Sequence, residues 1–209
     1  MSDTQKKKGP SFYKERIYPV LFMVIVTVIF ISAVSGLFLA TEDLVSLNET
    51  LFQKKAVLYS ADIPLPEAGA EIEKLYQSRV EEIQTPEGLA FRIMDESGRD
   101  AGWAVFSSGP GLWGEITAVV GYNATGEEMT GVEFVKQNET PGLGARITEE
   151  WFKEQFRSKR PPFIMVPEGT SRGQSEIDSI TGATRTSNAV LRLMNSSIEK
   201  AKTAMEEAK

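Results

Sequence analysis

Hydroxyl side chains gather in residues 178–190, DSITGATRTSNAV, directly before the last predicted helix. A hydroxyl in this position can cap the helix by accepting hydrogen bonds from its first backbone amides. The same amides, with the partial positive charge of the helix start, also form a seat for a phosphate group. A phosphate ester on Thr184 would lie in that field, with Gly182 leaving room and Arg185 or Arg172 supplying a counter-charge. Both interpretations stay open from the residues alone.

A second segment, residues 109–114, reads GPGLWG and satisfies the spacing G-x-G-x-x-G. A dinucleotide-binding fingerprint follows a strand and opens a helix. Here the segment leads into the strand-like EITAVV and contains Pro110, which has no amide hydrogen. A glycine-rich turn is therefore the favoured interpretation. Another remains open, in which Leu112 and Trp113 lie against a flat ring.

The third segment, residues 139–144, reads ETPGLG and follows the strand-like TGVEFVKQ. Pro141 makes the entry stiff and the two glycines make the backbone permissive, so the loop could approach a ligand while presenting Glu139 and Thr140. Turns of this composition are common. Taken alone, the segment indicates a turn more strongly than a binding site.

The composition limits the chemistry available to these segments. The chain of 209 residues has no cysteine and no histidine. It therefore has no disulfide, no thiolate nucleophile and no cysteine-ligated metal, and it lacks the usual general base and the commonest metal ligand. No metal site is expected. Redox or group-transfer chemistry would have to come from carboxylates, hydroxyls or a group that the protein binds.

The elements that would position these segments follow from hydrophobic periodicity. Helical spacing predicts a stalk helix over EDLVSLNETLFQKKAVLYS and further helices over AEIEKLYQSRVEEI, TEEWFKEQFRSK and the C-terminus. Alternation predicts two β-hairpins, LAFRIM with AGWAVF and EITAVVGY with TGVEFVKQ, and a strand at FIMVP. The terminal helix has one apolar stripe, formed by Val190, Met194, Ile198, Ala201 and Met205. The fold class is therefore α+β, with one N-terminal transmembrane helix followed by a mixed sheet of hairpins flanked by helices.

An uncharged run at residues 17–40 is long enough to cross a bilayer. A signal peptide, the alternative, has a shorter apolar core and a small-residue cleavage site, which SGLFLATED does not offer. Basic residues before the run predict a cytoplasmic N-terminus; they are Lys6, Lys7, Lys8, Lys14 and Arg16. The expected parts are a cytoplasmic N-terminus at 1–16, the transmembrane helix at 17–40, a stalk and helical segment at 41–86, and an extracytoplasmic domain at 87–209. That outer part is acidic, so no nucleic acid partner is expected.

The three segments together resemble a known family. SITGAT with RTSNAV, preceded by NETPGLG and GPGLWG, is similar to the FMN-binding subunits of respiratory ion pumps, which include the G subunit of the Rnf complex and the C subunit of the sodium-translocating NADH:quinone reductase. The resemblance covers roughly residues 90 to 200 and the layout of the anchor. It implies an FMN-binding domain on the outer face of a bacterial or archaeal cell membrane. It also implies partners: the other membrane subunits of such a complex, the lipid bilayer, and a flavin transferase for maturation.

The resemblance also implies roles for individual residues. Thr184 matches the threonine that carries covalent FMN through a phosphoester. Ser179, Thr181, Gly182 and Ala183 match the element that the transferase recognises. Glu139, Thr140 and Leu143 match the E-T-P-G-L-G loop, which is expected near the flavin ring. Leu112 and Trp113 match the G-L-W element of the quinone-reductase branch. Asp178 matches an acidic residue that commonly precedes the attachment motif.

Some family features are absent or mixed. The histidine that often precedes the E-T-P-G-L-G loop is replaced by KQN, and the motifs do not separate the Rnf branch of the family from the quinone-reductase branch. The resulting hypothesis is an electron-transfer subunit that carries covalent FMN in an ion-translocating oxidoreductase. Two alternatives stay open: a stand-alone extracytoplasmic flavin-dependent reductase, and an anchored binding domain without a cofactor.

Overall fold

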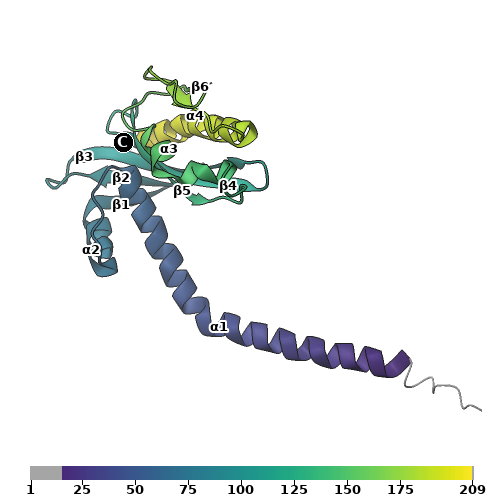
Figure 1. Cartoon of the computed structure of the whole chain (residues 1–209). Helices are drawn as coiled ribbons and strands as arrows, with labels where there is room; N and C mark the ends of the chain where they lie inside the picture. The colour runs from purple at the N-terminus through teal and green to yellow at the C-terminus, as the bar shows by residue number, and fades with distance from the viewer. Residues whose placement is uncertain (1–15, 209) are drawn as a thin grey trace, which may run out of the picture. The chain divides into compact units, whose positions relative to one another are not determined.

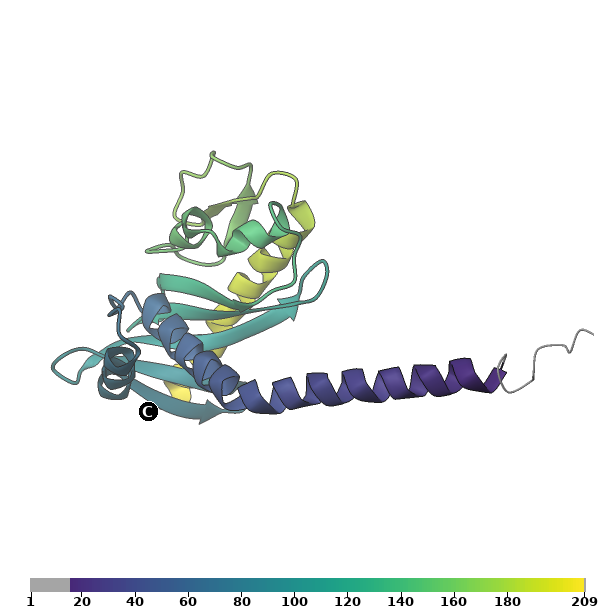
Figure 2. The same ribbon diagram turned by 60° about the horizontal axis from the view of Figure 1, so that its bottom comes forward.

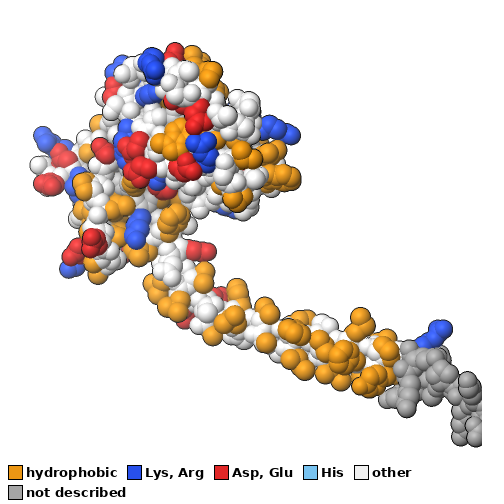
Figure 3. All heavy atoms as spheres, in the orientation of Figure 1, with side chains coloured by type: hydrophobic (Ala, Val, Ile, Leu, Met, Phe, Trp, Pro, Cys, Tyr) orange, Lys and Arg blue, Asp and Glu red, His pale blue; other side chains and the backbone are white. Residues whose placement is uncertain are grey.

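The computed structural model describes residues 16–208 and divides into two compact units, Met1–Asn48 and Glu49–Lys209. A single helix, α1 (Tyr18–Ser60), begins in the first unit and ends in the second. Within the first unit its large apolar side chains are exposed, as the space-filling view shows (Figure 3). The helix is long and apolar enough to cross a membrane. The predicted long apolar N-terminal helix is confirmed.

The second unit is built on a five-stranded antiparallel sheet whose strands follow chain order (Figure 1). The strands are β1 (Val80–Thr85), β2 (Gly88–Met94), β3 (Asp100–Pro110), β4 (Glu115–Asn123) and β5 (Met129–Lys136). Both predicted hairpins form: β2 pairs with β3, and β4 pairs with β5. A separate two-stranded parallel sheet contains β6 (Ile164–Val166) and β7 (Glu176–Asp178).

Both faces of the large sheet are buried, and each strand contributes to both because neighbouring side chains on a strand point to opposite faces. On β3, Trp103 and Val105 belong to the core shared with α4 (Thr184–Glu207). Between them, Ala104 belongs to a second core, formed with the end of α1 and with α2 (Gly69–Arg79). Figures 1 and 2 show α4 on one side of the sheet and α2 on the other. The α+β architecture predicted from the periodicity is confirmed.

Helix α4 packs through the apolar stripe that the sequence predicts. Val190, Met194 and Ala201 are fully buried, and Ile198 and Met205 pack against the same core. The stripe places one face of α4 on the sheet. It thereby fixes where the N-terminus of α4, and the T-G-A-T element before it, lies relative to the strands.

Three local predictions differ from the structure. The helix expected through Ile83 ends at Arg79, and its last residues instead form β1, which pairs with β2 along its whole length. The helix expected over TEEWFKEQFRSK is shortened to α3 (Glu150–Glu154). Strand β7 forms in a region where the sequence patterns predict no strand. The two strands are fixed by pairing, of β1 with β2 and of β7 with β6, and periodicity within a short window does not report that pairing.

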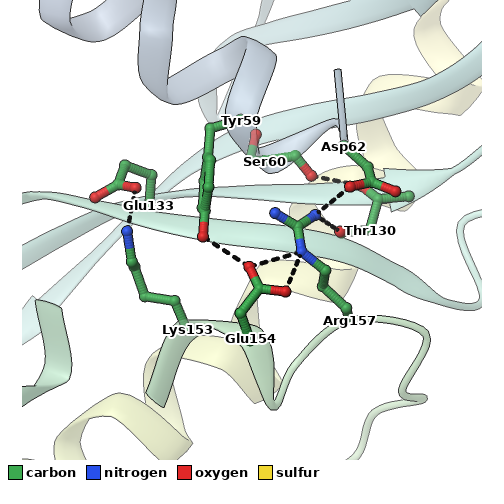
Figure 4. Close-up of polar contacts among 8 residues, drawn as sticks. All are labelled: Tyr59, Ser60, Asp62, Thr130, Glu133, Lys153, Glu154 and Arg157. Carbon is green, nitrogen blue, oxygen red and sulfur yellow. Dashed lines mark hydrogen bonds and ion pairs between the residues drawn. The ribbon is translucent and has the colours of Figure 1, made fainter. Parts of the chain in front are cut away.

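Hydrogen bonds and ion pairs connect the end of α1 to the sheet and to the region of α3 (Figure 4). The Tyr59 hydroxyl donates to Glu154 at 2.7 Å, and Arg157 forms ion pairs with Glu154 at 2.7 Å and with Asp62 at 2.9 Å. Burial, reinforced by the hydrogen bond to Glu154, raises the pKa of Tyr59. The Lys153 ammonium lies 4.4 Å from the centre of the Tyr59 ring. The last turn of α1 is therefore part of the folded second unit.

Candidate functional site

The buried carboxylate of Glu139 joins the three sequence segments that could do chemistry. Its Oε1 accepts the backbone amides of Leu112 at 2.9 Å and Trp113 at 3.1 Å. Its Oε2 accepts the hydroxyl of Thr186, in the first turn of α4. Only 5% of Glu139 is exposed. One side chain thus ties the G-P-G-L-W-G loop, the E-T-P-G-L-G loop and the start of α4 together.

Two glycines allow this close approach. A Cβ on Gly111 would lie 2.6 Å from Glu139 Oε1, and a Cβ on Gly144 would lie 2.6 Å from Thr186 Oγ1 and 2.9 Å from Glu139 Oε2. Real Cβ atoms do not make contacts this short. The glycines at positions 111 and 144 are therefore explained by the space around one carboxylate.

Exposed apolar side chains surround the junction. Trp113 is 70% exposed, Leu143 42% and Leu112 37%. The Trp113 indole N–H donates to Thr140 Oγ1 at 3.0 Å, which orients the ring. Leu143 also approaches the T-G-A-T element, because a Cβ on Gly182 would lie 3.1 Å from its Cδ2. Gly182 itself has φ +81°, a conformation that favours glycine.

Thr184 is the first residue of α4, and its side chain is exposed. The N-cap residue is Ala183, and no side chain caps the helix. Thr184 therefore does not act as the cap. The Ser187 hydroxyl instead accepts the backbone amide of Ile180 at 3.0 Å and donates to the Ala183 carbonyl at 3.1 Å, which holds the turn before the helix.

Glu168 holds the same turn from the other side, and sequence reasoning missed it. Its Oε2 accepts the backbone amide of Thr181 at 2.7 Å, and its Oε1 pairs with Arg146 at 3.0 Å. These hydrogen bonds, with the amide of Thr181 the largest contribution, lower the pKa of Glu168 to about 2. Nothing in the sequence marks Glu168, because it lies in a polar loop with no motif. Thr186 and Ser187 were at least visible as hydroxyls in the first turn of the helix.

The remaining predicted residues lie around this junction or beside it. Asp178 is directed to a neighbouring loop, where it accepts the amides of Thr170 at 3.0 Å and Ser171 at 2.8 Å. The Ser179 amide donates to the Val166 carbonyl at 2.8 Å, which continues the β6–β7 pairing. Thr181, Gly182, Arg185 and Arg172 are exposed, whereas Ala183 is buried.

The geometry suits a ligand with one anionic end and one flat apolar end. The uncapped N-terminus of the 24-residue helix α4 and the exposed Arg185 offer an anion seat beside the Thr184 hydroxyl. The exposed Leu112, Trp113 and Leu143 offer apolar surface. Among residues 16–208 no group of three acidic side chains could hold a metal ion. The site therefore offers binding and a nucleophilic hydroxyl.

Comparison with known proteins agrees with this geometry. Residues 111–199 match the model of the FMN-binding domain. The chain is 32% identical over 181 residues to the G subunit of the ion-translocating oxidoreductase complex of Methanosarcina acetivorans, covering 84% of this chain and 92% of that protein. It is 32% identical over 196 residues to the G subunit of the Na⁺-translocating ferredoxin:NAD⁺ oxidoreductase complex of Acetobacterium woodii, covering 87% and 92%. The crystal structure of Shewanella oneidensis NqrC has a similar fold, with a TM-score of 0.66 at 20% identity, covering 74% of this chain and 95% of that one.

Proposed function

The chain belongs to the FMN-binding subunit family of ion-translocating oxidoreductase complexes, and we propose that it carries FMN as a phosphoester on Thr184 and relays electrons within such a complex. The observation that carries this proposal is the convergence of two distant loops on the start of α4, where Thr184 is exposed. The similarity to both G subunits extends over nearly their whole length, which supports a role as one component of a complex rather than as a stand-alone reductase.

Different side chains hold different parts of the cofactor. The amides at the start of α4 and Arg185 stabilise the phosphate next to its point of attachment. Leu112, Trp113 and Leu143 cover apolar ring surface, and Thr140 fixes the indole of Trp113. FMN, when bound, supplies the redox chemistry, so the protein needs no acid–base residues of its own. This agrees with a chain that lacks histidine and cysteine.

Attachment requires a separate flavin transferase in this proposal. Thr184 Oγ forms the new bond to the phosphorus of an activated flavin phosphate, and the bond from phosphorus to its leaving group breaks. The hydroxyl proton leaves with that group. The exposed Thr181 and Gly182 present the recognition element to the transferase, together with Ser179 and the Ala183 backbone.

Mass spectrometry of the protein co-expressed with its transferase tests the attachment site. We expect FMN minus water on the peptide that contains Thr184, and no adduct in the Thr184→Val variant. Thr125→Val is the matched control, because Thr125 is an exposed threonine in the turn between β4 and β5. An adduct on another residue would refute the site, and a colourless wild-type protein would favour a cofactor-free binding domain.

We also propose that residues 17–40 span the membrane with the N-terminus in the cytoplasm. The apolar, exposed first part of α1 supports the span. Of the basic residues that predict the orientation, only Arg16 lies within the described residues, and the rest of the predicted segment 1–16 lies outside them. Protease digestion of intact cells and of inverted vesicles, followed by mass mapping, tests the orientation. Residues 41–209 should be cleaved only from the outer side.

A further inference from the structure

The carboxylate of Glu139 is placed to align the two ends of the site without facing the ligand. It is 5% exposed, and both of its oxygens already accept hydrogen bonds from the protein. Its own backbone amide donates to Gln137 Oε1 at 2.7 Å, so the residue is held at both ends. Side chains expected to contact a flavin ring need exposed surface. Glu139 has almost none.

Each donor to Glu139 belongs to a segment that carries an exposed site residue. The amides of Leu112 and Trp113 belong to the two residues whose side chains form apolar surface. Thr186 lies two residues after Thr184, in the same helical turn. The next residue after Glu139, Thr140, accepts the Trp113 indole N–H. A displacement of this carboxylate would therefore change the position of Trp113 relative to Thr184.

We propose that Glu139 is a positioning residue that sets Trp113 in register with the attachment point on α4. It acts through two backbone amides and the Thr186 hydroxyl. It does not act through its charge on the ring. The proposal deepens the proposed function and rests on it, but the alignment that it describes belongs to the protein before any flavin is attached.

The alignment is measured by ¹⁹F NMR of the full-length chain in detergent, without flavin and labelled with 5-fluorotryptophan. The chain has three tryptophans, and Trp113→Phe assigns the reporter signal. In Glu139→Ala we expect the Trp113 resonance to move towards that of free 5-fluorotryptophan and to narrow, since the two hydrogen bonds to its loop and the one to Thr186 are lost. The signals of Trp103 and Trp151 should stay in place and show that the fold is intact.

Conservative variants separate a positioning role of Glu139 from an effect of its negative charge. In Glu139→Gln the amide oxygen still accepts the two backbone N–H groups and the NH₂ group can donate to Thr186 Oγ1, so we expect the wild-type Trp113 signal. Thr186→Val removes one of the three contacts and should give an intermediate shift, whereas Thr186→Ser should not. Glu115→Gln is the matched control, because Glu115 is an exposed carboxylate on β4.

The flavinylated protein gives a second, independent readout. If Glu139 acts only by position, Glu139→Gln keeps the midpoint potential of the flavin; a raised potential would show that the charge acts on the ring and would overturn the proposal. An unmoved Trp113 signal in Glu139→Ala, or a Gln variant that behaves like Ala, would also overturn it. If Glu139→Ala unfolds, the signals of all three tryptophans move to the free 5-fluorotryptophan position together. The Glu139→Gln and Thr186 variants then test the proposal. Absence of any adduct on wild-type Thr184 defeats the proposed function but leaves the ¹⁹F comparison intact.

Discussion

Substitution of Gly144 by alanine should force the centre of the site apart. The added Cβ would lie 2.6 Å from Thr186 Oγ1 and 2.9 Å from both Glu139 Cβ and Oε2, whereas ordinary contacts begin at 3.4 Å. The two side chains cannot both retreat, because they are buried and bonded to each other. Overpacking of this kind costs about 1–3 kcal/mol. For a chain of this size that corresponds to a fall in melting temperature of about 2–12 °C.

Thermal unfolding of the detergent-solubilised protein, followed by circular dichroism, measures this loss. Gly109→Ala is the matched control, because Gly109 lies on β3 and a Cβ there meets nothing within 4 Å. We expect the control to change the melting temperature by less than about 2 °C. Equal melting temperatures for the two variants would show that the packing around Glu139 is loose, and the argument from glycine spacing would fail. Flavinylation of Gly144→Ala should also fall, because the start of α4 moves.

Three further perturbations test separate contacts. Removing the hydroxyl in Tyr59→Phe breaks its hydrogen bond to Glu154 and should lower the free energy of unfolding by about 1 kcal/mol, as measured by denaturant titration. Ser187→Ala leaves a buried backbone amide without its partner and should cost about 1–3 kcal/mol in the same assay; no change would mean that the turn before α4 is held by other contacts. The folded-state pKa of Glu168 is depressed to about 2, so its stabilising contribution is complete above about pH 4.5 and is lost as the pH falls towards 2. The amide resonance of Thr181 should therefore titrate near pH 2 in wild type and not in Glu168→Gln, and a midpoint near 4.5 would contradict the bond between them.

Local pattern was sufficient where a segment's residues fit only one period. The hairpin β2–β3 follows from alternating residues on either side of a short polar turn, and the stripe on α4 follows from helical spacing. The boundary at Val80 did not follow, because V-E-E-I fits a helical stripe and a strand equally well until β2 pairs with it. The long apolar helix needed no partner at all, since length and composition define it.

The sequence by itself predicts which segments carry the chemistry: the T-G-A-T, E-T-P-G-L-G and G-L-W motifs, from their order and their resemblance to FMN-binding subunits. Only the tertiary structure decided how they meet. It turned Glu139 inward between two glycines, left Thr184 exposed at an uncapped helix start, and brought Glu168 to the amide of Thr181. The physical reason is that a residue type states which hydrogen bonds a side chain can make. Whether those bonds are made to the protein or left for a ligand depends on which distant backbone amides the fold places beside it.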